Sequence, residues 1–241
     1  MAVYACSDFH GYYEVYEKIK NILNPEDVVY FLGDACDRGP RSWDTVKAIY
    51  DDPQFIFIKG NHEDMLVKAA KDYLKHDDWQ FHSFNLCHYN GGKDTMMDWE
   101  NDIYRETWIR RLDELPTMKT YTNEWGMTFI LCHAGFTPWL DANDKDLASV
   151  TDYELIWDRD HYWTKWSDCD MADVVVVHGH TPIEGLAEDI REVPGEGAFW
   201  YCERHKVDID AGGFYANKWI LLNLDTLEET IITADDFKEY F

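Results

Sequence analysis

Five short apolar runs in this chain each end in a cluster of polar side chains, and this pattern constrains the fold more than any other feature. The runs lie in the segments "AVYACSDFHG", "DVVYFLGD", "QFIFIKGNHED", "MTFILCHAG" and "ADVVVVHGHTP". Between the first three runs, residues 12–24 and 43–52 space their apolar side chains at helical intervals. This strand–helix–strand–helix–strand order predicts a parallel sheet, and α/β proteins bind ligands at the carboxyl ends of such strands.

The second half of the chain is rich in expected strands. Besides the last two runs above, "KVDIDAGG" and "KWILLNLD" have the apolar character of strands. A second sheet packed on the first, with helices outside both, gives the predicted fold class, which is α/β (α+β) in a four-layer α/β/β/α sandwich of two mixed sheets. Because the chain has no repeat and no low-complexity linker, residues 1–241 are predicted to form a single domain. A helical, aromatic-rich insertion is expected at about 65–115, interrupted by Asn90–Gly92.

Composition and charge argue against several classes of protein. Hydrophobic residues make up 46% of the chain, which is enough for a sizeable core. No apolar run reaches the ~18–20 residues that a membrane span requires, and the N-terminus lacks the pattern of a signal peptide. The formal net charge of −25 argues against nucleic acid as a partner, because such binding uses a basic surface. The six cysteines form no C-x-x-C pair, so we expect reduced thiols and a cytoplasmic location.

The polar residues at the strand ends carry the donor atoms of a metal site. They are Asp8 and His10 after the first run, followed by Asp34, Asn61, His133 and His180 after the others. A single histidine at a strand end is ordinarily a hydrogen-bonded structural residue, so the combination carries the argument. Carboxylate, amide and imidazole donors together suit Mn, Fe, Zn or Ni, and Asp34 could bridge two ions. Two ions about 3.5–4 Å apart can clamp a phosphate and share a hydroxide nucleophile.

The segments "SDFHG", "GDACDRG", "GNHE", "CHAG" and "HGHTP" resemble, in order, the signature of the calcineurin-like metallophosphoesterases. That signature reads G-D-x-H-G, G-D-x-x-D-R-G and G-N-H-E, followed by two later histidines. Within it the chain resembles the bacterial and phage branch of the phosphoprotein phosphatase (PPP) family, which also carries N-G-G-x-x-T and W-x-R segments. These match residues 90–95 and 157–159. Ser7 replaces the usual glycine of the first motif, at a position that supplies no donor atom.

The resemblance implies two divalent metal ions, with Mn²⁺ expected first and Fe, Zn or Ni as alternatives. One metal would be held by Asp8, His10 and Asp34. The other would be held by Asn61, His133 and His180 together with Asp34, which both metals share.

The resemblance also implies catalytic and substrate-binding roles. His62 is expected to act as a general acid that protonates the leaving oxygen, with Asp37 orienting its ring. Arg38 and Arg159 are expected to grip the phosphate oxygens, and Asn61 to lie at the substrate as well as at the metal. This division of labour is chemically reasonable, because planar arginines match phosphoryl oxygens and an alkoxide leaving group needs a proton.

The implied function is a metal-dependent phosphomonoester hydrolase of the Ser/Thr protein phosphatase type, with dual specificity left open and metal-bound hydroxide as nucleophile. Pro182 stands where many nucleases and phosphodiesterases of this superfamily have a second histidine, and this favours phosphomonoesters. The substrate would be a phosphorylated protein or a small phosphate. The alternative is a symmetrical bis(5'-nucleosyl)-tetraphosphate hydrolase, whose nucleobase the aromatic insertion could stack. A non-catalytic binding module is disfavoured because every expected ligand is present.

Three residue assignments remain open in the sequence. Arg159 could instead form a surface ion pair with Asp158 or Asp160, and Asn90–Gly92 could be a plain turn. Two histidines compete in "HGHTP". We expect His180 to be the ligand, because the turn at Gly179 puts it at the tip of the strand, and we expect His178 to be a buried structural residue. The oligomeric state is not indicated.

Overall fold

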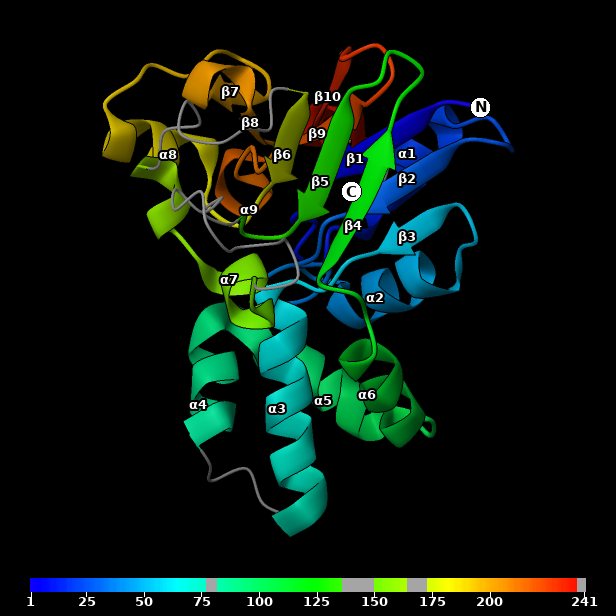
Figure 1. The fold of residues 1–241 in the computed structure, drawn as a ribbon. Helices are drawn as coiled ribbons and strands as arrows, with labels where there is room; N and C mark the ends of the chain where they lie inside the picture. The colour runs from blue at the N-terminus through cyan, green and yellow to red at the C-terminus, as the bar shows by residue number, and fades with distance from the viewer. Residues whose placement is uncertain (77–81, 136–149, 164–172, 238–241) are drawn as a thin grey trace.

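The computed structural model describes residues 1–76, 82–135, 150–163 and 173–237, which form two mixed five-stranded sheets (Figure 1). The first sheet has the order β10 (Glu229–Thr233), β9 (Lys218–Asn223), β1 (Val3–Cys6), β2 (Val28–Phe31), β3 (Phe55–Phe57). Its β1, β2 and β3 are parallel, whereas β9 and β10 run antiparallel to their neighbours. The second sheet has the order β4 (Met118–Thr122), β5 (Thr128–Cys132), β6 (Val174–His178), β8 (Lys206–Asp208), β7 (Phe199–Tyr201). Its β5, β6 and β8 are parallel.

Helices cover the outer faces of both sheets. The first sheet carries α1 (Tyr13–Ile22) and α2 (Ser42–Asp51), and the second carries α7 (Asp152–Trp157) and α8 (Ile183–Ile190). A short helix, α9 (Gly213–Ala216), precedes β9. Three short 3₁₀ turns lie in the connections, and they are η3 (Asp160–Trp163), η5 (Cys202–Arg204) and η6 (Ala234–Phe237). The predicted four-layer α/β/β/α sandwich is confirmed.

The alternation of side chains along the central strands produces two core layers. In β9, Trp219 and Leu221 join the core under α1 and α2, whereas Ile220 and Leu222 join the core between the sheets. Because neighbouring strand residues point to opposite faces, a strand buried on both faces is apolar throughout. A third, smaller cluster on the outer face of the second sheet includes Val176 and α7 residues.

A helical lobe extends from the first sheet (Figure 1). It contains α3 (Asn61–His76), α4 (His82–Cys87), the π-helical turn η1 (His88–Gly92), α5 (Lys93–Asn101) and α6 (Arg105–Asp113). Trp99 and Trp108 are buried in the core shared with α1 and α2, so these aromatic side chains pack the lobe against the sheet. That the whole chain is one domain with an insertion stays a prediction. Among the described residues, no helix has the length and apolar character needed to cross a membrane.

Gly213 should be intolerant of a side chain. A Cβ built there would lie 2.0 Å from Nε1 of Trp219, a buried residue whose indole donates to the Asp8 carbonyl at 3.2 Å. We expect Gly213→Ala to lower the free energy of unfolding by ~1–3 kcal/mol through overpacking, measured by chemical denaturation. Gly185→Ala is the matched control, since a Cβ there meets nothing within 4 Å in helix α8 and should stabilise the protein slightly. Equal effects of the two variants would contradict this packing.

Candidate metal centre and active site

The carboxyl ends of the central strands meet at one edge, and backbone hydrogen bonds fix their loops to one another. The loop after β1 pairs with the loop after β2, through Asp8 N to the Gly33 carbonyl at 3.0 Å and His10 N to the Asp34 carbonyl at 2.9 Å. In the second sheet, Gly179 N donates to the carbonyl of His133 at 2.8 Å. The two sheets are joined here as well, because Nδ1 of His133 bonds the Leu32 carbonyl at 2.7 Å.

Six candidate site residues adopt the left-handed backbone conformation. Their φ angles lie between 45° and 72°, and they are Asp8, His10, Asp34, Asp37, Arg38 and His180. Such angles are uncommon for residues with a Cβ, and each costs on the order of 1–3 kcal/mol unless the surroundings hold it. Among the described residues these are six of the twelve non-glycine residues with positive φ, so half of this strain lies in one small cluster, as is common for functional sites.

Asp34 lies at the centre of the cluster, with one histidine near one of its carboxylate oxygens and two near the other. Its Oδ1 is 3.3 Å from Nε2 of His133, while its Oδ2 is 3.7 Å from Nε2 of His10 and 3.8 Å from Nε2 of His62. Two groups of potential ligands therefore share this one carboxylate, with donor atoms within 4.8 Å of one another in each group. One group is His10, Asp34 and His62, and the other is Asp34, His133 and His180.

Asn61 contributes to the second group from the first residue of α3. Its side-chain oxygen lies 2.8 Å from Nε2 of His133 and 2.9 Å from Nδ1 of His180. An amide oxygen and two imidazole nitrogens therefore converge beside Asp34, which is a donor set suited to a borderline divalent cation.

Asp8 lies beside the first group. Its Oδ2 accepts the backbone N–H of His180 at 3.3 Å, while its Oδ1 is buried without a hydrogen-bond partner, 4.0 Å from Nε2 of His10. Burial, with a further contribution from Asp210, raises the pKa of the Asp8 carboxyl well above its ordinary value. A buried carboxylate oxygen with no proton donor facing a histidine fits a cation, so the residues present suit the metal that the sequence implies.

The charges of the cluster compensate one another. Although burial disfavours the charged ring, the adjacent Asp34 carboxylate raises the pKa of His133 to about 10. Burial would likewise raise the pKa of Asp34, but the charges of His133 and His62 hold it well below the usual range. Burial, together with His133, lowers the pKa of His180 well below its ordinary value, so this ring is neutral and has a lone pair available for a metal.

His62 and Asp37 form a buried pair next to this cluster. Nδ1 of His62 lies 2.7 Å from Oδ2 of Asp37, and its Nε2 points toward Asp34. Burial opposes the charged ring, yet the carboxylates of Asp34 and Asp37 outweigh it and raise the pKa of His62. His62 is therefore a histidine with one nitrogen fixed by a carboxylate and the other directed at the centre.

The two arginines reach the cluster from opposite sides. The Arg38 guanidinium donates to Nε2 of His10 and of His62, both at 3.0 Å, and lies 5.3 Å from the centroid of the Phe214 ring. Nε of the exposed Arg159 donates to Nε2 of His180 at 3.4 Å. Within the described parts of the chain, Arg159 makes no ion pair with Asp158 or Asp160, and its role in phosphate binding stays a prediction.

The Asn90–Gly92 segment packs against the turn that carries Arg38. The Gly91 carbonyl accepts the backbone N–H of Arg38 at 3.1 Å, and a Cβ on Gly92 would lie 3.1 Å from Oδ1 of Asp37. The helical lobe thus supports the Asp37–Arg38 turn through a π-helical turn that ends in two glycines. This is more than the plain turn that the sequence left open.

Sequence reasoning assigned no role to two buried carboxylates in the site. Glu63 accepts three backbone N–H groups, from Asp34 at 2.9 Å, Ala35 at 2.8 Å and Gly60 at 2.9 Å. Asp210 is buried near Asp8, and burial raises its pKa to about 6. Both residues follow apolar runs: Glu63 ends the segment "GNHE", and Asp210 ends the segment "VDID". The signal used for the other strand ends could therefore have found them.

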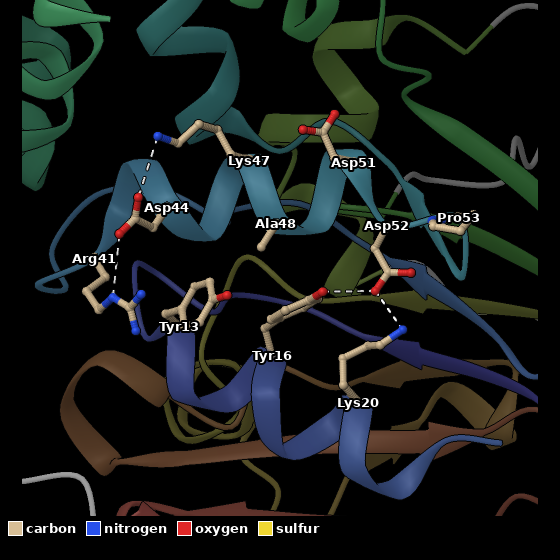
Figure 2. A pocket seen from close by; sticks show the side chains of 10 residues that line it. All are labelled: Tyr13, Tyr16, Lys20, Arg41, Asp44, Lys47, Ala48, Asp51, Asp52 and Pro53. Carbon is tan, nitrogen blue, oxygen red and sulfur yellow. Dashed lines mark hydrogen bonds and ion pairs between the residues drawn. The ribbon is translucent and has the colours of Figure 1, made fainter. Parts of the chain in front are cut away.

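A shallow cavity of about 720 Å³ lies between α1 and α2, and none of its lining residues belongs to the cluster around Asp34 (Figure 2). Its charged side chains already form ion pairs, most of them with one another and one between Asp51 and Arg111 outside the lining. Lys20 lies 2.7 Å from Asp52, and Asp44 forms ion pairs with Arg41 and Lys47 at 3.6 and 3.5 Å. Because these charges are already paired, this surface lacks the converging unpaired donors of the metal cluster.

Comparison with known proteins agrees with the fold and gives the family of this chain. The profile of the calcineurin-like phosphoesterase family matches residues 1–213, and the chain belongs to this family, as the five motifs predicted. The chain is 26% identical to Serine/threonine-protein phosphatase 2 of Escherichia coli (strain K12) over 163 residues, which is 66% of this chain and 68% of that protein.

Solved structures share the fold. A protein described provisionally as a diadenosine tetraphosphatase has a TM-score of 0.63 and 15% identity, over 96% of this chain and 92% of that one. A protein serine/threonine phosphatase from Saccharomyces cerevisiae has a TM-score of 0.61 and 14% identity, over 97% of this chain and 79% of that one.

Replacing Glu63 should destabilise the loops that carry the site residues. Glu63→Gln keeps the shape of the side chain but turns one acceptor into a donor that faces backbone N–H groups. We expect the free energy of unfolding of the metal-free protein to fall by ~1–3 kcal/mol, measured by denaturant titration. The exposed Glu188→Gln on α8 is the matched control and should be neutral. An unchanged midpoint for Glu63→Gln would mean that this carboxylate does not hold the loops.

Proposed function

We propose that this protein is a metal-dependent phosphomonoester hydrolase, specifically a Ser/Thr protein phosphatase. The observation that carries the proposal is the pair of ligand groups sharing Asp34, with the buried His62–Asp37 pair directed at the same point. Membership of the calcineurin-like phosphoesterase family and the similarity to Serine/threonine-protein phosphatase 2 support it.

Asp8, His10 and Asp34 would hold one divalent metal, and Asp34, Asn61, His133 and His180 would hold the other, with Mn²⁺ as the first candidate. The two ions, when bound, supply a nucleophile from water near neutral pH and neutralise phosphate charge. His62 lies close enough to Asp34 for the first ligand group as well, and we assign it to proton transfer because Asp37 holds its other nitrogen.

His62 would donate a proton to the leaving oxygen. With Nδ1 bonded to Asp37, the transferable proton would lie on Nε2, the nitrogen directed at the centre, once the Arg38 guanidinium that donates to Nε2 in the metal-free protein turns to the phosphoryl oxygens. Burial opposes the charged ring, but the neighbouring carboxylates raise the pKa of His62 and so shift the ring toward the protonated form that an acid needs. An alkoxide is a poor leaving group, so this proton is most needed for phosphoserine and phosphothreonine.

Arg38 and Arg159 would bind the phosphoryl oxygens from the two sides of the cluster. Both guanidinium groups already donate to ring nitrogens of site histidines, at positions that an anion entering the cluster would also face. A planar guanidinium matches two phosphoryl oxygens at once and stabilises the charge that spreads over them during transfer.

The substrate class rests on charge and on one residue. Pro182 leaves the last motif with a single histidine, which favours phosphomonoesters, and the net charge of −25 disfavours polyanionic substrates. The second candidate is a symmetrical dinucleoside tetraphosphate hydrolase, supported by the fold shared with the structure described provisionally as a diadenosine tetraphosphatase. We favour the phosphoprotein substrate.

Parallel assays would test this choice. Purified protein with measured metal content is incubated with a phosphoserine peptide, diadenosine tetraphosphate and p-nitrophenyl phosphate. We expect kcat/KM to be highest for the phosphopeptide. A preference for diadenosine tetraphosphate would establish the second candidate, and no turnover of any substrate with Mn²⁺ bound would leave a non-catalytic binding module.

If Asp34 bridges both metals, its replacement should change the metal content of the protein differently from the loss of any other ligand. We expect Asp34→Asn to lower the occupancy of both metals, whereas His180→Ala should lower the occupancy of one, because only Asp34 belongs to both ligand groups. Elemental analysis of the two variants beside wild type measures this. Loss of a single metal in Asp34→Asn would remove this residue from the bridge.

Proton donation by His62 predicts a dependence on the leaving group. His62→Asn should retain both metals and lower kcat on a phosphoserine peptide by roughly 10²–10⁴-fold, the usual contribution of a general acid. The loss should be smaller for p-nitrophenyl phosphate, whose leaving group barely needs a proton. Steady-state kinetics on both substrates tests the role, and equal losses would count against it.

A further inference from the structure

A lysine with no solvent exposure lies beneath the site and belongs to none of its ligand groups. Lys206 is on β8, where it pairs with Val176 of β6 and Tyr201 of β7, and its exposed fraction is 0%. Val176 belongs to the cluster on the outer face of the second sheet, so Lys206 projects from that same face. An ammonium group in such a place is costly unless it is hydrogen-bonded, so its partners carry information.

The amine of Lys206 is used to hold the main chain beside Arg159. Its Nζ donates to the carbonyl of His161, in the 3₁₀ turn η3, and lies 5.8 Å from the centroid of the Tyr201 ring. His161 comes two residues after Arg159 and is fully buried, in contact with Gly135, where a Cβ would meet its ring at 2.5 Å. The turn that carries Arg159 is therefore fixed from below by a side chain of the sheet.

A second bond ties the same turn to the ligand loop. The Tyr162 hydroxyl donates to Oγ1 of Thr181, which directly follows His180. Arg159 itself is exposed, and its described polar contact with the cluster is the single 3.4 Å bond to His180. One long bond holds this side chain only weakly, so its position depends on the two anchors of the turn, at the His161 carbonyl and the Tyr162 hydroxyl.

We propose that Lys206 is a positioning residue that holds η3 so that Arg159 faces the metal cluster. This inference rests on the proposed function through the phosphate-binding role of Arg159. It predicts that removing the amine weakens phosphate binding while the metal ligands stay in place, because none of the contacts described for Lys206 involves a metal ligand.

Lys206→Met keeps the length and apolar stem of the side chain and removes its donor. With both metals loaded, we expect the affinity for inorganic phosphate, measured by calorimetry, to fall roughly tenfold. We expect a similar fall in kcat/KM for p-nitrophenyl phosphate. A change of this size is typical of the interaction energy between neighbouring residues. Metal content should be unchanged. Backbone hydrogen exchange over residues 152–163 of the metal-free protein should become faster. Lys119→Met, an exposed lysine on β4 of the same sheet, is the matched control and should alter none of these.

A double-mutant cycle separates positioning from general loss of structure. In an Arg159→Ala background, Lys206→Met should have no further effect on phosphate affinity, whereas a merely structural role would weaken it by the same factor as in wild type. Additive losses would overturn the proposal, and so would unchanged phosphate affinity in the single variant.

If Lys206→Met fails to fold, Tyr162→Phe, which removes the other anchor, is put through the same cycle and judged by the same criteria. Wild-type protein that binds phosphate but hydrolyses no ester would refute the proposed function and leave this test intact.

Discussion

The buried carboxylate of Glu63 is the contact on which the geometry of the site depends. It accepts backbone N–H groups from Asp34 and Ala35 after β2 and from Gly60 after β3. One side chain thus joins two neighbouring strand ends to the first turn of α3. Gly60 permits the approach, since a Cβ there would lie 2.3 Å from Oδ1 of Asp34. The N–H of His62 completes the arrangement by donating to that oxygen at 3.0 Å.

Burial of so many ionisable groups is tolerable because their charges oppose one another. In the metal-free protein, Asp34 and His133 share an ion pair that favours folding over a defined range of pH. The depressed pKa of Asp34 makes its contribution present above the ordinary carboxyl value of 3.8 and lost as the pH falls through its folded value. The raised pKa of His133 makes its contribution present below the ordinary value of 6.5 and lost as the pH rises toward about 10. A bound cation takes the place of the proton, so metal affinity and pH are linked.

The sequence predicted the central strands and their polar ends because those features are local. An apolar run followed by Asp, Asn or His is visible without knowing what packs on it, and the parallel order brings such ends together. The strands that it did not indicate are β4, β7 and β10, and each lies at an edge of its sheet. The pattern is weak in β4 and β10 because three of the five residues in "MKTYT" and in "ETIIT" are exposed, whereas β7 is only three residues long.

The supporting residues were harder to predict, for a different reason. Nothing local distinguishes Lys206 from a surface lysine, since its burial follows from the packing of η3 and β7 around it. The left-handed conformations of Asp8, Asp34 and His180 were also beyond sequence reasoning, because propensity assigns such angles to glycine. Tertiary contacts impose both features, and both concern the site rather than the fold.

Those left-handed residues set activity against stability. At each of the six positions a glycine would relieve the backbone, yet it would delete a group that we assign to metal binding, to phosphate binding or to the orientation of His62. Selection for thermal stability alone would therefore tend to erase this centre, beginning with the residues under most strain. Engineering for heat resistance should fix these positions first and seek its gains elsewhere, for example at helix caps or at unstrained glycines such as Gly185.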